Sequence, residues 1–307
     1  MILLCGIPTE SPLALVAQEL QALGHPFAVF HQRRWAEYGL EGAVRDGCVT
    51  GRLRLGPLKV ALEEVRGVYT RLMDDRRLPG VEGRPAGDPW SARCRALHAA
   101  LAGWTEVMPG RVVNRAAPQG SNASKPYQAQ LIARHGLAVP RTLVTNDPEA
   151  VLDFRRRHGR VIFKSISGVR SIVRELHDDD LRRLERIRWC PVQFQERVEG
   201  FDVRVHCVGG EVHACAVASD AVDYRYAVHQ VGSPAVLEPY ELDGDLASRC
   251  LALTDALGLE LSGIDLRLDG DGRAWCFEVN PSPAFSYYEH HTGLPIARAI
   301  ARHLAAA

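Results

Sequence analysis

Residues 262–283 read SGIDLRLDGDGRAWCFEVNPSP, and this stretch decides the fold that we expect for the chain. Apolar and polar residues alternate on both sides of residues 269–272, Asp-Gly-Asp-Gly, a composition typical of a tight β-turn. The two prolines at the end stop the second strand, because proline cannot donate a ladder hydrogen bond. The stretch therefore predicts a β-hairpin in which Leu268 faces Arg273.

This register brings three polar side chains onto one face of the hairpin. Asp265 would lie opposite Cys276. Glu278 would lie opposite Gly263, which makes Asp265 and Glu278 diagonal neighbours. Asn280 follows Glu278 by two residues and points the same way, because side chains alternate along a strand. The side chains expected on the opposite, core-facing side are Ile264, Leu266, Phe277 and Val279.

The chemistry of these three polar side chains suits a metal ion. Two carboxylates on a half-buried face repel each other unless a positive charge lies between them. Carboxylate and amide oxygens bind Mg²⁺, which takes its remaining ligands from water and phosphate. The pattern therefore indicates a magnesium site at Asp265, Glu278 and Asn280. The alternative is that both acids pair with arginines, which are plentiful in the chain.

The composition of the whole chain narrows its class. Its 307 residues are 46% hydrophobic and 24% charged, as in a globular protein large enough for more than one domain. The formal net charge of zero argues against nucleic acid or an anionic membrane as the main partner. No apolar run is long enough to cross a membrane, and the first residues lack the basic start of a signal peptide.

The eight cysteines are scattered and form no Cys-x-x-Cys pair. Most of them lie in apolar, strand-like stretches, so we expect small buried side chains rather than a disulfide framework or a zinc site. Free cysteines of this kind are typical of a reducing compartment, and the expected location is the cytoplasm.

Hydrophobic periodicity and capping residues predict a small N-terminal α/β unit that ends near Asn114, followed by a longer mixed region. The expected strands of the first unit are 1–6, 27–31 and 65–74, and its expected helices are 10–23 and 91–106. Further along, the expected helices are 124–136, 147–159, 178–187 and 243–257, and the expected strands are 141–145, 160–165, 192–198, 202–209 and 211–219.

Lysine is rare in this chain. Of 37 basic residues only three are lysines, namely Lys59, Lys125 and Lys164. A lysine kept among so many arginines is a candidate for a site that needs a compact, mobile ammonium group. Lys125 begins a predicted helix and Lys164 lies on a predicted strand, whereas chance is the simpler explanation for Lys59.

The hairpin resembles the metal site of ATP-grasp enzymes, with Asp265, Glu278 thirteen residues later, and Asn280 in the ending Asn-Pro-Ser-Pro. The resemblance runs from about Asn114 to the C-terminus and is closest to the RimK-like branch. Within that branch the sequence looks most like the peptide-modifying ligases, including the graspetide (microviridin-type) macrocyclases. It implies an α/β (α+β) ATP-grasp fold. The implied parts are a pre-ATP-grasp α/β domain at 1–114, a central subdomain at 115–190 and a C-terminal subdomain with the metal site at 191–307.

The resemblance assigns two groups of residues to the phosphates of ATP. Lys125 and Lys164 match the two lysines that contact the phosphates, where a lysine acts as a mobile point charge. Residues 165–171, SISGVRS, match the flap over the phosphates, with Ser167 and Gly168 as binding residues. The family versions of this flap are richer in glycine.

Residues 194–209, FQERVEGFDVRVHCVG, resemble the hinge that binds adenosine. Backbone groups of Glu196, Arg197 and Val198 would read the adenine edge, with the Glu196 carboxylate near the amino group. Asp202 would take the ribose hydroxyls.

Two arginines are the implied catalytic residues. Arg204 alternates with Asp202 on one strand face, and the sequence DVR matches an Asp-x-Arg of the peptide-modifying relatives. Arg225, in DYRY, stands where the family places a second cation near the transferred phosphate. Outside this frame, an arginine on a strand is usually solvated.

The implied activity is ATP-dependent activation of a carboxylate as an acyl phosphate, followed by attack of an amine or hydroxyl. The implied cofactors are ATP and Mg²⁺, two ions by the family pattern, with Mn²⁺ as a substitute. The expected substrates are a ribosomally made peptide or a small-molecule carboxylate and a nucleophilic acceptor, and a homodimer is one option for the assembly. The alternatives left open are a ligase that adds an amino acid to a peptide or metabolite, a kinase, and a non-catalytic ATP-binding regulator.

Overall fold

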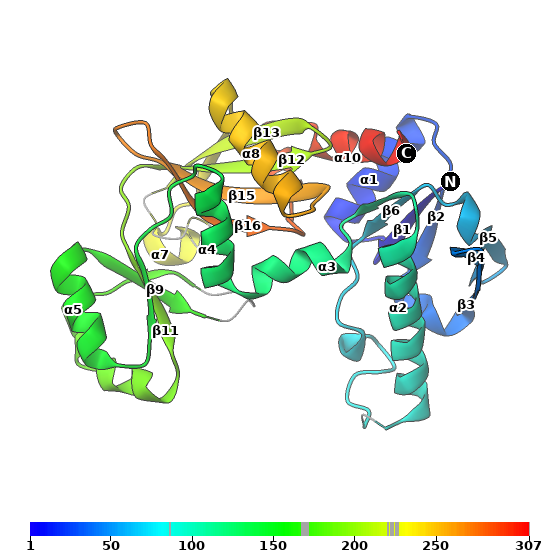
Figure 1. Ribbon diagram of the computed structural model, residues 1–307, viewed down its shortest axis with the longest axis horizontal. Helices are drawn as coiled ribbons and strands as arrows, with labels where there is room; N and C mark the ends of the chain where they lie inside the picture. The colour runs from blue at the N-terminus through cyan, green and yellow to red at the C-terminus, as the bar shows by residue number, and fades with distance from the viewer. Residues whose placement is uncertain (86, 167–171, 220, 222–223, 225–226, 307) are drawn as a thin grey trace.

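The computed structural model describes residues 1–85, 87–166, 172–219, 221, 224 and 227–306. Within these residues the strands β1 to β16 form four sheets. Figure 1 shows the N-terminal sheet at one end of the molecule and the strands β9 and β11 at the other, with β12, β15 and β16 between them. No helix in the described ranges is long and apolar enough to cross a membrane.

The N-terminal sheet is parallel, with the strand order β2–β1–β6–β7. Its strands are β1 Ile2–Gly6, β2 Phe27–His31, β6 Gly67–Thr70 and β7 Arg111–Val113. A parallel sheet needs cover on both faces. Helices α1 Ser11–Ala22 and α10 Ile296–Ala305 cover one face, and α2 Pro89–Val107 covers the other. The expected strands and helices of this unit are therefore confirmed.

An antiparallel meander of three strands, which the sequence patterns did not reveal, lies beside this sheet. Its strands are β3 Tyr38–Arg45, β4 Cys48–Leu55 and β5 Leu58–Ala61. Its inward side chains Leu53, Leu55 and Val60 are buried against the N-terminal core. Three glycines interrupt the alternation of β3 and β4, and most of β3 is exposed, so the apolar pattern is too short to predict these strands.

The central sheet is antiparallel, with the order β10–β9–β11–β8. Its strands are β8 Thr142–Thr145, β9 Val161–Ser165, β10 Arg174–Glu175 and β11 Val192–Glu196, and its long helix is α5 Pro148–His158. The Asp147 carboxylate caps α5 by accepting from the Glu149 N–H, as predicted. The helix expected over 178–187 is wrong in extent: α6 spans only Asp178–Leu181, and a 3₁₀ helix follows at Leu184–Trp189.

The C-terminal sheet is antiparallel, with the order β14–β13–β12–β15–β16. Its strands are β12 Phe201–Val208, β13 Glu211–Ala218, β14 Val236–Tyr240, β15 Leu261–Leu268 and β16 Ala274–Asn280. Helices α4 Lys125–Arg134 and α8 Gly244–Ala256 pack on one face through a shared apolar cluster. The remaining helices are α3 Ala116–Gln119, α7 Ala227–Val231 and α9 Ser286–Thr292.

All eight cysteines are free, and only Cys48 and Cys190 are exposed, which agrees with the expectation that most cysteine side chains are buried.

Strand β11 pairs with β8 and β9, so it belongs to the central sheet. The three-part division of the chain stays a prediction.

Candidate active site

A cavity of about 380 Å³ lies between the central sheet and the C-terminal sheet. It is lined by six of the residues that the sequence predicted for the site, namely Lys164, Arg197, Val198, Asp202, Asp265 and Glu278. The structure thus brings together residues that are more than 100 positions apart in the chain, from both expected halves of an ATP site.

The hairpin that carries the two carboxylates has a different register from the predicted one. Leu268 pairs with Ala274 rather than Arg273, and the register shifts between Asp265 and Leu266. As a result Asp265 lies directly opposite Glu278, not diagonal to it. An extra residue on one strand of a pair produces such a shift, and a sequence pattern does not reveal it.

The same irregularity corrects the prediction for Phe277. Its ring was expected in the core, but it lines the cavity, while the neighbouring Cys276 is buried in the apolar cluster. The other three predicted core side chains, Ile264, Leu266 and Val279, are buried as expected.

Two buried amide side chains fix the hairpin. Gln128 of α4 donates to the Val279 carbonyl at 2.8 Å and accepts from the Val279 N–H at 3.0 Å. Asn114 donates to the carbonyls of Leu261 and Pro281 at 2.6 and 2.5 Å. These bonds hold the start of β15 and the end of β16 in place, and they fix α4 against β16. Pattern reasoning missed both residues, since an isolated amide gives no periodic signal.

Each carboxylate of the hairpin has a cation beside it. The Asp265 carboxylate accepts from an Arg204 N–H at 2.5 Å, and the Glu278 carboxylate lies 3.3 Å from the Lys125 ammonium. Lys125 begins α4, which Gln128 fixes to β16. The second lysine, Lys164, is buried on β9 and lines the cavity from the opposite side.

Arg204 is almost fully buried, and its surroundings are shaped around the guanidinium group. A Cβ atom at Gly263 would collide with the Arg204 Nη2, so this position has no room for a larger side chain. The Tyr288 ring lies 5.4 Å from the guanidinium carbon. The Arg204 Nε–H points at the His206 Nε2 at 3.5 Å.

The groups around Arg204 favour its charged form. Burial, and then the Arg204 charge, lower the pKa of His206 well below its ordinary value, so the imidazole stays neutral and can accept. Burial raises the pKa of Tyr224 well above the usual value, and its hydroxyl lies 2.7 Å from the Tyr288 hydroxyl. A neutral histidine and two tyrosines therefore surround one guanidinium that faces Asp265.

The hinge segment after β11 lies in the cavity wall, but the Glu196 side chain does not. Its carboxylate accepts from the Arg141 N–H at 2.7 Å, and the residue is not among those that line the cavity. The Glu196 carboxylate is therefore bound to the Arg141 backbone, and its contact with adenine stays a prediction. Within the described residues the Val198 N–H makes no hydrogen bond, whereas the Arg197 N–H donates to the Arg160 carbonyl at 2.9 Å.

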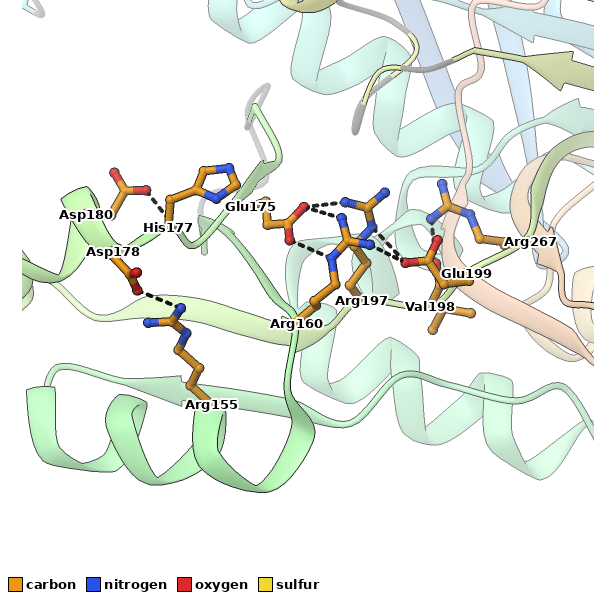
Figure 2. Close-up of polar contacts among 10 residues, drawn as sticks. All are labelled: Arg155, Arg160, Glu175, His177, Asp178, Asp180, Arg197, Val198, Glu199 and Arg267. Carbon is orange, nitrogen blue, oxygen red and sulfur yellow. Dashed lines mark hydrogen bonds and ion pairs between the residues drawn. The ribbon is translucent and has the colours of Figure 1, made fainter.

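A chain of ion pairs fixes the hinge segment to the central sheet (Figure 2). The Glu175 carboxylate lies between Arg160 and Arg197 and accepts from both. Arg160 also donates to Glu199 at 2.7 Å. The hydrogen bonds from Arg160, against a smaller effect of burial, lower the pKa of Glu175 to about 2. Glu175 therefore stays ionised in this network.

Three predicted site residues, Ser167, Gly168 and Arg225, lie outside the described residues. Asn280 follows Glu278 on β16, and its side-chain oxygen accepts from the Ser282 N–H at 2.9 Å. Asp202 does line the cavity, and both of its oxygens accept from Arg267, a residue that the sequence patterns did not single out.

The donor set at Asp265, Glu278 and Asn280 fits a magnesium ion. Two carboxylates directly opposite each other on a hairpin have Cβ atoms about 4.5–5.5 Å apart, close enough to share one ion. The part of the chain that the structure describes has no cluster of three or more His, Cys, Asp and Glu side chains placed for a metal. A site with two acids and one amide takes its remaining ligands from water and phosphate, which is the coordination typical of Mg²⁺ in proteins.

Comparison with known proteins agrees with this geometry. Residues 123–304, more than half of the chain, match the model of the RimK-like ATP-grasp domain. A protein of Rhodopirellula baltica named probable alpha-L-glutamate ligase is 28% identical over 206 residues, which are 63% of this chain and 49% of that protein. The chain thus spans about half the length of this relative.

Two solved structures resemble the chain over nearly its whole length. The macrocyclase MdnC from Microcystis aeruginosa, bound with precursor peptide MdnA, is 25% identical, covers 100% of both chains and has a TM-score of 0.79. The ATP-grasp ligase PsnB, complexed with a minimal precursor, is 28% identical, covers 99% of this chain and 98% of its own, and also has a TM-score of 0.79.

Proposed function

The chain belongs to the RimK-like ATP-grasp family, and we propose that it is an ADP-forming ligase that joins a carboxylate to an amine or hydroxyl on a ribosomally made peptide. The observation that carries the proposal is the pair Asp265 and Glu278, directly opposite each other in the cavity wall, each beside a cation. Phosphoryl transfer needs mainly positioning and neutralisation of charge, and this arrangement supplies both.

The hinge end of the cavity would hold adenosine. The Val198 N–H has no partner within the described residues and would donate to the base, and Asp202, which lines the cavity, would accept from the ribose hydroxyls. Lys164 and Lys125 would contact the phosphates as point charges. Mg²⁺ at Asp265, Glu278 and Asn280 would neutralise charge that develops on the transferred phosphate.

In the first step, a substrate carboxylate oxygen attacks the γ-phosphorus of ATP, and the bond to the ADP oxygen breaks to give an acyl phosphate. In the second, the amine or hydroxyl attacks the acyl carbon, phosphate leaves, and the nucleophile releases its proton. Arg204, buried and held by Asp265, would stabilise negative charge in both steps. Arg225 is proposed as a second cation for the same charge.

The peptide substrate is supported by the two structural neighbours that were solved with a precursor peptide and that match almost the entire chain. The test is the intact mass of the small peptide encoded beside this gene, co-expressed with the enzyme, with Glu278→Gln as the control. Loss of one water per bond formed is the expected result. A mass that the active enzyme leaves unchanged would overturn peptide ligation.

A second candidate, addition of an amino acid to a peptide or small metabolite, is favoured by the similarity to the protein named alpha-L-glutamate ligase. It predicts a gain of one amino-acid residue in mass. ADP release that depends on an acceptor separates either ligase from a non-catalytic regulator. A phosphorylated product would instead identify a kinase.

Three finer points belong to the same proposal. The site would hold two Mg²⁺ ions, with Mn²⁺ as a substitute, which metal titration with ATP tests. The division into parts at 1–114, 115–190 and 191–307 would place adenosine at the border of the last two. The protein would work either alone or as a homodimer, which its mass in solution decides.

A further inference from the structure

Arg267 of β15 contacts three different parts of the cavity wall. Its Nε and Nη2 each donate to one oxygen of Asp202, both at 2.8 Å. Its Nη1 donates to the Val198 carbonyl at 2.9 Å, a contact that can be followed in Figure 2. Its guanidinium carbon lies 5.4 Å from the centre of the Phe277 ring. All four residues line the cavity.

Arg267 lies on the same strand face as the carboxylate Asp265. It follows Asp265 by two residues, so both side chains lie on the cavity face of β15. A single rigid side chain therefore connects the strand of the metal site to the hinge at Val198 and to the carboxylate at Asp202. A planar fork suits this task, because the five N–H donors of a guanidinium group keep fixed relative directions.

The contacts of Arg267 with Val198 and Asp202 determine which polar groups at the hinge are already bonded. The Val198 carbonyl is occupied by Arg267, whereas the Val198 N–H has no partner within the described residues. Asp202 is held by two charge-assisted bonds that fix the plane of its carboxylate, with side-chain exposures of 18% for Arg267 and 16% for Asp202. One side chain thus contacts both the hinge carbonyl and the Asp202 carboxylate, and Asp202 and Arg267 are also direct neighbours in the ladder between β12 and β15.

We propose that Arg267 is a positioning residue for the nucleotide: it sets the distance between the hinge and Asp202, and so the affinity for adenosine and the preference for a nucleotide with ribose hydroxyls. This inference rests on the proposed function, since it assigns adenosine to the hinge end of the cavity. The competing explanation is a structural ion pair, which would contribute to stability and leave the choice of nucleotide unchanged.

The experiment compares the dissociation constants of ATP and 2′,3′-dideoxy-ATP, each with Mg²⁺, for the wild type and Arg267→Lys. In the wild type we expect ATP to bind about tenfold more tightly than the dideoxy analogue, the value of a hydrogen bond to a charged group. Arg267→Lys should weaken the binding of ATP by about the same factor. It should also bring the ratio of the two dissociation constants near one, because the plane of the Asp202 carboxylate is no longer fixed.

The same hairpin offers a matched control, Arg273→Lys. Arg273 is exposed, does not line the cavity, and lies over the Trp275 ring at 4.4 Å. Like Arg267 it contacts an aromatic ring, but it does not contact the hinge. We expect its nucleotide ratio to equal that of the wild type. Thermal unfolding of both variants shows whether each is folded at the assay temperature.

Several outcomes overturn the inference. An unchanged ratio in folded Arg267→Lys would make Arg267 a structural residue only. If Arg267→Lys does not fold, Arg267→Gln provides the same comparison, and an unchanged ratio there is equally decisive. A wild type that binds neither nucleotide would refute the adenine site itself, whereas a wild type that binds both equally would refute only the role of Asp202 and Arg267.

Discussion

At the hinge end of the cavity one carboxylate, Glu175, is shared by two arginines, whereas at the phosphate end each carboxylate has a cation of its own. The hinge pairs join elements of the protein to one another, and two of their members, Arg197 and Glu199, line the cavity. The pairs at the phosphate end lie in the wall that a metal and a triphosphate would contact. Ion pairs of similar length can therefore have two roles. In one place they link elements of the protein permanently, and in another they neutralise carboxylates until a ligand takes over that task.

The exchange at the phosphate end follows from charge. Without a ligand, Lys125 and Arg204 neutralise two carboxylates that would otherwise repel each other across the hairpin. With a metal ion on the carboxylates, both cations would gain a new partner in the proposed phosphates without leaving the site. The hinge network joins the hinge segment to the central sheet, so we expect its loss to affect stability rather than catalysis.

Glu278→Gln should have the largest effect. The amide keeps the size of the side chain but cannot neutralise a metal ion, so we expect ADP release with acceptor present to fall by roughly 1000-fold or more. Thermal stability should change little, because within the described residues this carboxylate pairs with one cation, Lys125, at the long distance of 3.3 Å. Asp271→Asn, in the exposed turn of the same hairpin, is the control. Normal turnover of Glu278→Gln would show that this carboxylate is not a metal ligand.

Arg204→Lys should reduce kcat by roughly 100-fold, since a lysine keeps the charge but cannot reach Asp265 and the transferred phosphate with a fixed fork. Steady-state kinetics of the folded variant measure this effect, with Arg298→Lys on the surface as the control. A variant that loses thermal stability but keeps the wild-type kcat would place Arg204 among the purely structural ion pairs. That result would also remove the difference between the two ends of the cavity.

Lys164→Met should raise the dissociation constant of ATP by about tenfold, because one charge-assisted contact to phosphate is lost. The dissociation constant of adenosine should not change, since this nucleoside has no phosphate. Lys59→Met is the matched control, because the Lys59 side chain is exposed on β5 and does not line the cavity. If Lys164→Met weakened the binding of ATP and of adenosine equally, Lys164 would support the site without contacting phosphate.

The sequence predicted the elements of the site better than their exact pairing. Alternation along two strands was enough to place Asp265, Glu278 and Asn280 on one hairpin, because a side-chain period of two is a strong local signal. The irregularity between Asp265 and Leu266 is a matter of three-dimensional fit, so the predicted register was wrong there and Phe277 was assigned to the wrong face.

The partners of the charged residues could not be predicted for a different reason. Arginines are so frequent that any acid has many candidates, and only the fold selects Arg267 for Asp202 or Arg204 for Asp265. Lysine gave a clearer signal because it is rare. In the structure Lys125 lies beside the Glu278 carboxylate, and Lys164 lines the cavity. The assignment of these residues to ATP stays a prediction.

Glu175→Gln should have the smallest effect of the set, and on stability alone. The ordinary pKa of 4.5 is lowered to about 2 in the folded protein, so the carboxylate stabilises the fold above about pH 4.5 and this contribution disappears as the pH falls toward 2. We expect the variant to lose about 1 kcal/mol of unfolding free energy at pH 7, discounted for the exposure of Arg160.

Denaturant unfolding of wild type and Glu175→Gln from pH 7 to pH 2 measures this difference, which should shrink steadily on acidification. Glu185→Gln is the control, because its pair with Arg188 is exposed on both sides and should add nothing measurable. A kcat that fell with Glu175→Gln while stability stayed constant would contradict the assignment of the hinge pairs as permanent links. The difference between the two ends of the cavity would then lie in distance from the phosphate, and not in what each ion pair can exchange.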